Sequence, residues 1–348
     1  MTQAPQPIFG FLTYNSRSGS TLLSRLLNDF VDVCVTLEPD LPTELFGAKG
    51  GQPLVFNDAG AAISYLQRSW ILTKLSTWPV SKDDLCTQLQ TLAFPLSGPQ
   101  LVEWLVLNFR LVTKPHSKLV IYKGPPVMPW EASRIFPWFP KWIWIQILRD
   151  PRGVFNSQLK SINPYEQKSF ASHPCETAVE WQRGLQTCRS LPSESYREIR
   201  FEDLVSDSDR VLDQLLNSIS RLSTIKDNAG TQFAGQMPEA EQILHSNIVR
   251  KPDLERAHAW QKELTPAQIR VVECVTAPWL ESAGYQNVEL SSGKNQHCLK
   301  LLYTLRYDFR RRRRRLVRIL NGICHHPRSY LDKLRARWQI FHREGDTK

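Results

Sequence analysis

The fold of this chain is decided by residues 8–27, Ile8-Phe9-Gly10-Phe11-Leu12-Thr13-Tyr14-Asn15-Ser16-Arg17-Ser18-Gly19-Ser20-Thr21-Leu22-Leu23-Ser24-Arg25-Leu26-Leu27. The apolar run at 8–14 predicts a buried strand, and the leucines after residue 21 predict a helix. The polar residues between them predict a tight turn. Such a turn directs backbone N–H groups and the positive end of a helix at one point, which suits a phosphate group.

The side chains of this turn also suit an anion. Arg17 carries a fixed positive charge, Gly19 allows a close approach of the backbone, and Ser18, Ser20 and Thr21 offer hydroxyl donors. The alternative is an ordinary capped turn with Arg17 in solvent. The turn does not match the nucleotide-binding pattern G-x-x-x-x-G-K-[ST], because it has one glycine and no adjacent lysine.

A second anion-binding signal follows residues 142–148, which read as a strand buried on both faces. Arg149 ends this strand, and Pro151 marks the first turn of a helix. Ser157 follows two helical turns later. Ligands of open α/β sheets gather at the carboxyl ends of the strands, so Arg149, Ser157 and the first turn are expected on one rim.

With these motifs in view, the chain resembles the sulfotransferases that use 3′-phosphoadenosine 5′-phosphosulfate, PAPS, which have a P-loop-like fold. The family motif K/R-[ST]-G-[ST]-[ST] is matched by residues 17–21, and its arginine with a serine eight positions later is matched by Arg149 and Ser157. A softer match to R-Y-E-D-L lies at residues 200–205. The motif style is closest to carbohydrate and tyrosylprotein sulfotransferases, and the resemblance extends to about residue 285.

The resemblance implies how the donor binds. The 5′-phosphosulfate would lie on the backbone of residues 17–21, with Arg17 neutralising the leaving phosphate. Arg149 and Ser157 would hold the 3′-phosphate. No metal is implied.

Further assignments concern the rest of the nucleotide. Arg200 or Trp181 is expected to border the adenine, and Asn247 or Arg250 to close over the phosphates. Trp181 reads equally as a core aromatic on a helix.

Two further residues are expected to act on the acceptor. Glu38 follows a short predicted strand and matches the position of a catalytic glutamate in the family, so it is the candidate general base. Asp40 is its close competitor, and a solvated loop acid is the alternative. Lys123 ends the predicted strand 118–122 and resembles the lysine of a K-D-P element, although Gly124 stands where the acid would be. It is the candidate for stabilising the sulfuryl oxygens, or else it pairs with a nearby carboxylate.

The wider pattern predicts an α/β fold, a parallel β-sheet flanked by helices. Residues 1–293 are expected to form the sulfotransferase domain, and residues 41–115 a helical insertion that builds much of the acceptor pocket. Strands are expected near 8–14, 32–37, 118–122, 142–148 and 196–200. Helices are expected near 21–30, 59–77, 99–112, 151–160, 174–190, 207–220 and 265–282.

The net charge of +10 belongs to the tail. Residues 294–348 carry 16 Lys and Arg against 4 Asp and Glu, which leaves 28 against 30 for residues 1–293. A nearly neutral body argues against a nucleic-acid-binding domain. The tail is expected to be a basic helical extension with apolar spacing over 299–341, suited to peripheral contact with an anionic membrane. Packing on the body, contact within a homo-oligomer and binding of a polyanion are the alternatives.

The sequence also bears on location and metal content. Residues 1–7 lead directly into the first strand without a signal-like segment, which favours the cytoplasm. The seven cysteines lack C-x-x-C spacing, which fits reduced thiols rather than a zinc site.

The expected function is therefore transfer of a sulfuryl group from PAPS to a hydroxyl or amine of a carbohydrate, glycolipid or other metabolite. A P-loop nucleotide-dependent kinase is one alternative. The other is a catalytically silent scaffold that binds adenosine bisphosphate and uses its tail on membranes or polyanions.

Overall fold

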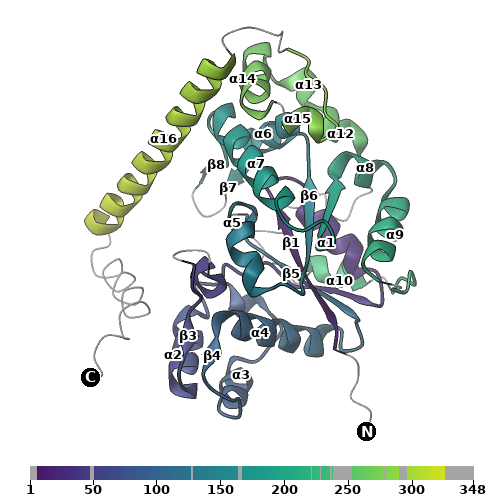
Figure 1. The fold of residues 1–348 in the computed structure, drawn as a ribbon, viewed down its shortest axis with the longest axis vertical. Coiled ribbons are helices and arrows are strands. Elements are labelled where there is room, and N and C mark those ends of the chain that lie inside the picture. Colours follow the sequence, from purple (N-terminus) through teal and green to yellow (C-terminus); the bar gives the residue numbers. More distant parts are fainter. Residues whose placement is uncertain are drawn as a thin grey trace.

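Five parallel strands form the centre of the fold, in the order β2-β5-β1-β6-β9 (Figure 1). All four pairings are parallel, and the register aligns Leu12 with Lys123 and Tyr14 with Ile147. The carboxyl ends of the strands therefore share one rim. The strands are β1 (Ile8–Tyr14), β2 (Val33–Val35), β5 (Leu119–Lys123), β6 (Ile143–Leu148) and β9 (Tyr196–Arg200).

The structure is a computed structural model that describes residues 6–47, 51–126, 128–163, 167–220, 222–227, 229–235, 237, 253–277, 279–289 and 296–325. Two short hairpins pair β3 (Val55–Phe56) with β4 (Leu96–Ser97) and β7 (Ile162–Asn163) with β8 (Lys168–Ser169). Its α-helices are α1 (Ser20–Asn28), α2 (Ala59–Ser69), α3 (Lys82–Leu89), α4 (Gly98–Thr113), α5 (Met128–Ile135), α6 (Pro151–Lys160), α7 (Pro174–Arg189), α8 (Phe201–Ser206), α9 (Ser208–Ile219), α10 (Ala229–Gly235), α12 (Leu254–His258), α13 (Trp260–Glu263), α14 (Pro266–Thr276), α15 (Trp279–Ser282) and α16 (Gln296–His325). Short 3₁₀ turns are η1 (Thr43–Phe46), η2 (Leu75–Thr77) and η3 (Phe136–Trp138).

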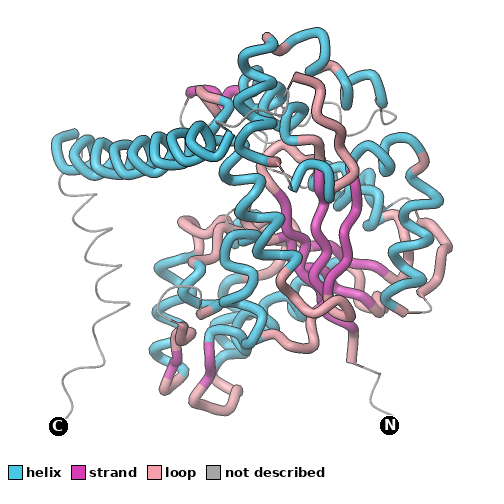
Figure 2. The backbone as a smooth tube through the Cα atoms, turned by 45° about the horizontal axis from the view of Figure 1, so that its top comes forward, coloured by secondary structure: helices cyan, strands magenta, loops and turns pink. Residues whose placement is uncertain are grey.

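Both faces of the sheet are covered. Figure 2 shows helices around the strands, and buried side chains pack against each face of the sheet. Alternate residues of β1 point to opposite faces. Phe11 joins a core shared with the 41–115 region and α5, whereas Leu12 joins a core shared with α1 and α9. This double burial explains why β1 is apolar almost throughout.

The α/β fold and all five strands of the sheet expected from the sequence are confirmed, within three residues at each end. Two expected helices are corrected. The helix over 265–282 divides into α14 and α15, because Ala277 precedes a proline and adopts an extended conformation, with ψ at 140°. The helix over 59–77 ends at Ser69, and a turn with Lys74 in the left-handed conformation leads to η2.

The basic extension begins as one long helix, α16, which projects from the body in both views (Figures 1 and 2). The second apolar pattern of the tail, at residues 331–341, lies outside the described residues. Among the described helices, none combines the length and the apolar character needed to cross a bilayer.

Candidate active site

The turn between β1 and α1 has an unusual backbone. Ser18 donates its N–H to the carbonyl of Asn15 at 3.0 Å, which closes the turn. Arg17 and Gly19 both have positive φ angles, 72° and 92°. A non-glycine residue held in this region costs about 1–3 kcal/mol, and such strain gathers at functional sites.

The second motif packs directly against this turn. Arg17 Nε donates to Ser157 Oγ at 3.3 Å, and Arg149 Nη1 donates to the carbonyl of Arg17 at 3.2 Å. Gln158 Nε2 adds a hydrogen bond to the carbonyl of Ser16 at 3.0 Å. The two segments expected on one rim therefore meet there.

Positive charge is concentrated at this junction. Arg149 Nη2 reaches the carbonyl of Arg256, from α12, at 3.2 Å. Burial, with the charges of Arg149 and Arg256, lowers the pKa of Arg17 to about 10. Burial likewise lowers the pKa of Arg149. The neighbouring charges of Arg149 and Arg256 disfavour the charged form of Arg17, and a bound anion would stabilise that form.

The core fixes the position of Arg149. Trp181 donates its indole N–H to the Arg149 carbonyl at 2.8 Å and is fully buried. The guanidinium of Arg149 lies 4.5 Å from the centre of the Phe201 ring, a cation–π contact. Trp181 is thus a core residue that holds Arg149, and its ring is not available to border an adenine.

At the other end of the turn, Lys123 links the loop to Glu38. Its ammonium lies 3.2 Å from Thr21 Oγ1 and 3.4 Å from Glu38 Oε2. Tyr14 donates its hydroxyl to the same Glu38 oxygen in a short hydrogen bond. Lys123 and Tyr14 are buried, whereas the Glu38 side chain is 19% exposed and is therefore partly open to solvent.

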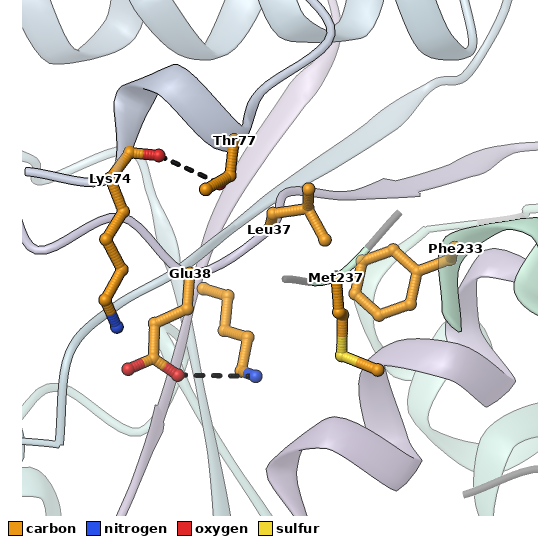
Figure 3. A pocket seen from close by; sticks show the side chains of 7 residues that line it. Leu37, Glu38, Lys74, Thr77, Phe233 and Met237 are labelled. Carbon is orange, nitrogen blue, oxygen red and sulfur yellow. Dashed lines mark hydrogen bonds and ion pairs between the residues drawn. The ribbon is translucent and has the colours of Figure 1, made fainter. Parts of the chain in front are cut away.

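A pocket opens at Glu38. Figure 3 shows the side chains of Leu37, Met237 and Phe233 to one side of Glu38 and that of Lys74 to the other, with Thr77 between Lys74 and Leu37. Lys74 also pairs with Asp40, 3.5 Å away, and Asp40 is more exposed than Glu38. The pocket therefore has an apolar side and a polar side, with a carboxylate between them.

Of the other residues expected to contact the nucleotide, the structure describes only Arg200. Arg200, at the end of β9, lies with its guanidinium 4.6 Å from the centre of the Tyr285 ring. Asn247 and Arg250 lie outside the described residues.

The polar groups of the site fit a bound anion. Among the described residues, three buried donors at this rim have no hydrogen-bond partner, namely Ser18 Oγ, Arg149 Nε and Arg200 Nε. The acceptor Asn15 Oδ1, in the same turn, is also without a partner. Buried donors without partners are costly, at about 1–3 kcal/mol each. A ligand with several phosphate or sulfate oxygens would satisfy them.

Sequence reasoning missed three residues of this site. Tyr14 is the last residue of the predicted strand 8–14, and its place at the carboxyl end of that strand is a signal that could have identified it. Arg256 lies on a short helix without a motif. Lys74 reaches the pocket through the left-handed turn after α2, which no local pattern indicated.

Comparison with known proteins agrees with this geometry. The family model described as the sulfotransferase family matches residues 11–221, which is more than half of the chain. This chain belongs to the sulfotransferase family. Among curated proteins, no relative matches this sulfotransferase.

Solved structures resemble this sulfotransferase at low identity. The sulfotransferase domain of the Synechococcus PCC 7002 olefin synthase is 14% identical, with a TM-score of 0.50, over 82% of this chain and 97% of that one. The sulfotransferase domain from the curacin biosynthetic pathway is 17% identical, with a TM-score of 0.49, over 82% and 100%. Retinol dehydratase in complex with androsterone and the inactive cofactor PAP is 13% identical, with a TM-score of 0.36, over 83% and 84%.

Proposed function

We propose that this sulfotransferase moves a sulfuryl group from PAPS to a hydroxyl or amine of an acceptor bound beside Glu38. The observation that carries the proposal is a continuous line of groups along one rim. The turn at residues 17–21 lies in the middle of this line. Glu38 and Lys123 lie at one end of it, and Arg149 and Ser157 lie at the other end.

The donor supplies an activated sulfuryl group on a phosphate. The turn would hold the phosphosulfate by its backbone N–H groups, and Arg17 would balance the charge of the departing phosphate. Arg149 and Ser157 would hold the 3′-phosphate, with Arg256 adding positive charge. Arg200 and Arg250 would contact the rest of the nucleotide.

The acceptor would be activated at Glu38. The acceptor oxygen forms its bond to sulfur as the bond from sulfur to the phosphate oxygen breaks, and the acceptor proton passes to the Glu38 carboxylate. Lys123 would stabilise charge on the sulfuryl oxygens, because its ammonium lies between Glu38 and the turn. Tyr14 would orient Glu38.

The pocket suggests what the acceptor looks like. Its lining combines Leu37, Phe233 and Met237 with Lys74 and Thr77. An acceptor with an apolar part and a polar, hydroxyl-bearing part fits these two sides best. A glycolipid or another amphipathic metabolite therefore fits better than a purely polar sugar, and the 41–115 region would contribute to selecting it.

The test is transfer of ³⁵S from labelled PAPS to cell extracts separated into lipid, glycan and protein fractions. We expect label in the lipid or small-metabolite fraction, and at most about a hundredth as much in the same time with Glu38→Gln protein. Phosphate transfer from ATP with Mg²⁺, in place of sulfuryl transfer, would support the kinase alternative. Binding of adenosine 3′,5′-bisphosphate without transfer to any fraction would support the silent scaffold.

A further inference from the structure

Helix α16 has one face packed on the body. Tyr307 is 3% exposed and lies in a cluster with residues of α7 and α14, among them Val179 and Val272. Its hydroxyl lies 3.1 Å from Glu180 Oε1. Ion pairs of Arg183 with Asp308, at 3.2 Å, and of Arg310 with Glu176, at 3.4 Å, lie beside it. This inner face fixes the orientation of the helix.

The opposite face is apolar and exposed. At 100° per residue, one stripe of the helix lies away from Tyr307. Its large side chains are 56–69% exposed, namely Leu301, Leu302, Leu305, Phe309 and Leu316. Single exposed apolar residues are ordinary, but a contiguous stripe of this kind marks an interaction surface.

The stripe is set in strong positive charge. Residues 296–325 contain nine Lys and Arg against one Asp. Arg306, Arg312 and Arg313 are exposed, and the helical spacing places them on or beside the stripe. A partner must therefore accept both apolar side chains and cations.

These two requirements select among partners. If a second copy of the chain bound through the same face, two arginine-rich helices would repel each other. The body of a second copy has 28 cations against 30 anions, so it offers the arginines little net negative charge. A nucleic acid would satisfy the arginines but would leave the leucines and Phe309 exposed. An anionic lipid surface satisfies both, because the apolar stripe enters the acyl boundary while the arginines meet the headgroups.

We propose that the outer face of α16 is a membrane-binding surface that lies flat on an anionic bilayer. Figures 1 and 2 show the helix at the outside of the molecule, and the exposed fractions of its apolar side chains mean that this face is accessible. The inner contacts of Tyr307 and Asp308 would then hold the catalytic body against the membrane. This inference does not depend on the acceptor or on the donor.

The experiment is co-sedimentation of the full chain with vesicles of phosphatidylcholine alone or with about 30% phosphatidylglycerol. We expect binding to the anionic vesicles only, and weaker binding at high salt. The double variant Leu305→Glu with Phe309→Glu should reduce the membrane partition coefficient at least about tenfold. Arg312→Gln with Arg313→Gln should reduce it about tenfold to thirtyfold.

A matched control is Leu111→Glu with Val112→Glu, which changes two residues of α4 that are 57% and 58% exposed. This control should bind as the parent does, and circular dichroism should show all variants folded. The proposal would be overturned if the parent did not bind anionic vesicles, or if the Leu305→Glu, Phe309→Glu variant bound them as well as the parent does. It would also be overturned if the parent self-associated in solution and only this double variant were monomeric.

Discussion

Arg149 donates a hydrogen bond from Nη1 to the backbone carbonyl of Arg17, with 3.2 Å between the two atoms. The two residues are 132 positions apart in the chain, but they follow the neighbouring parallel strands β6 and β1. Because the ends of parallel neighbours share one rim, two short motifs combine into one anion-binding region. Glu38 and Lys123 extend the same rim on the far side of Thr21.

Replacing Glu38 by glutamine should remove the base without removing the donor site. We expect transfer to slow by roughly 10²–10⁴, the usual scale for a lost general base, while affinity for adenosine 3′,5′-bisphosphate stays unchanged. Single-turnover kinetics with ³⁵S-labelled PAPS measures this. Asp40→Asn is the matched control, since Asp40 pairs with Lys74 at the edge of the pocket. If Asp40→Asn is the slower variant, the base is assigned to the wrong acid.

Tyr14 should act as a positioning residue for Glu38. Tyr14→Phe removes the hydrogen bond to the carboxylate and keeps the ring beside Lys123. We expect kcat to fall about tenfold, since a hydrogen bond to a charged group contributes about 1.5–3 kcal/mol, with unchanged nucleotide affinity. The control is Tyr122→Phe, whose hydroxyl is buried without a partner among the described residues. Equal kcat for Tyr14→Phe and the parent would exclude this role.

Gly19→Ala should destabilise the fold. The residue has a φ of 92°, and an added Cβ would come within 2.3 Å of Phe201 Cδ2. We expect the positive φ and the clash together to cost about 2–5 kcal/mol of unfolding free energy. Urea unfolding measures it. Gly51 has a φ of 84°, and no atom lies within 4 Å of an added Cβ, so Gly51→Ala measures the cost of the positive φ without a clash. Equal costs for the two variants would mean that Phe201 moves aside.

Nucleotide affinity should depend on the charge of Arg17. The pKa of Arg17 in the free protein is about 10, so the guanidinium is protonated at neutral pH and loses its proton above that value. A bound phosphate favours the protonated form, so affinity should be constant between about pH 7 and 9 and fall by up to about tenfold per pH unit above about 10. Fluorescence titration at each pH measures this. Arg17→Ala should bind weakly with a flatter profile; an equally steep fall in that variant would assign the titration to another group.

Much of the fold could be predicted because its signals are local. The strands are buried on both faces, so their apolar runs stand out, and Asp150 caps α6 where Pro151 begins it. The junction of Arg17 with Ser157 followed from the topology of parallel strands. Tyr14 could have been found from its place at the end of β1. Arg256 and Lys74 could not, because only tertiary packing brings them to the site. Trp181 was open to two interpretations, since a periodic pattern does not distinguish a core aromatic from one that faces a ligand.

The most direct test of the central claim is isothermal titration calorimetry with adenosine 3′,5′-bisphosphate. We expect one site per chain in the parent and a loss of at least about tenfold in affinity for Arg149→Ala, because a charge-assisted contact disappears. The control is Arg210→Ala, which removes an exposed arginine paired with Asp207 and should leave binding unchanged. No heat of binding in the folded parent, or equal affinity in the Arg149→Ala variant, would contradict the assignment of this rim to the nucleotide.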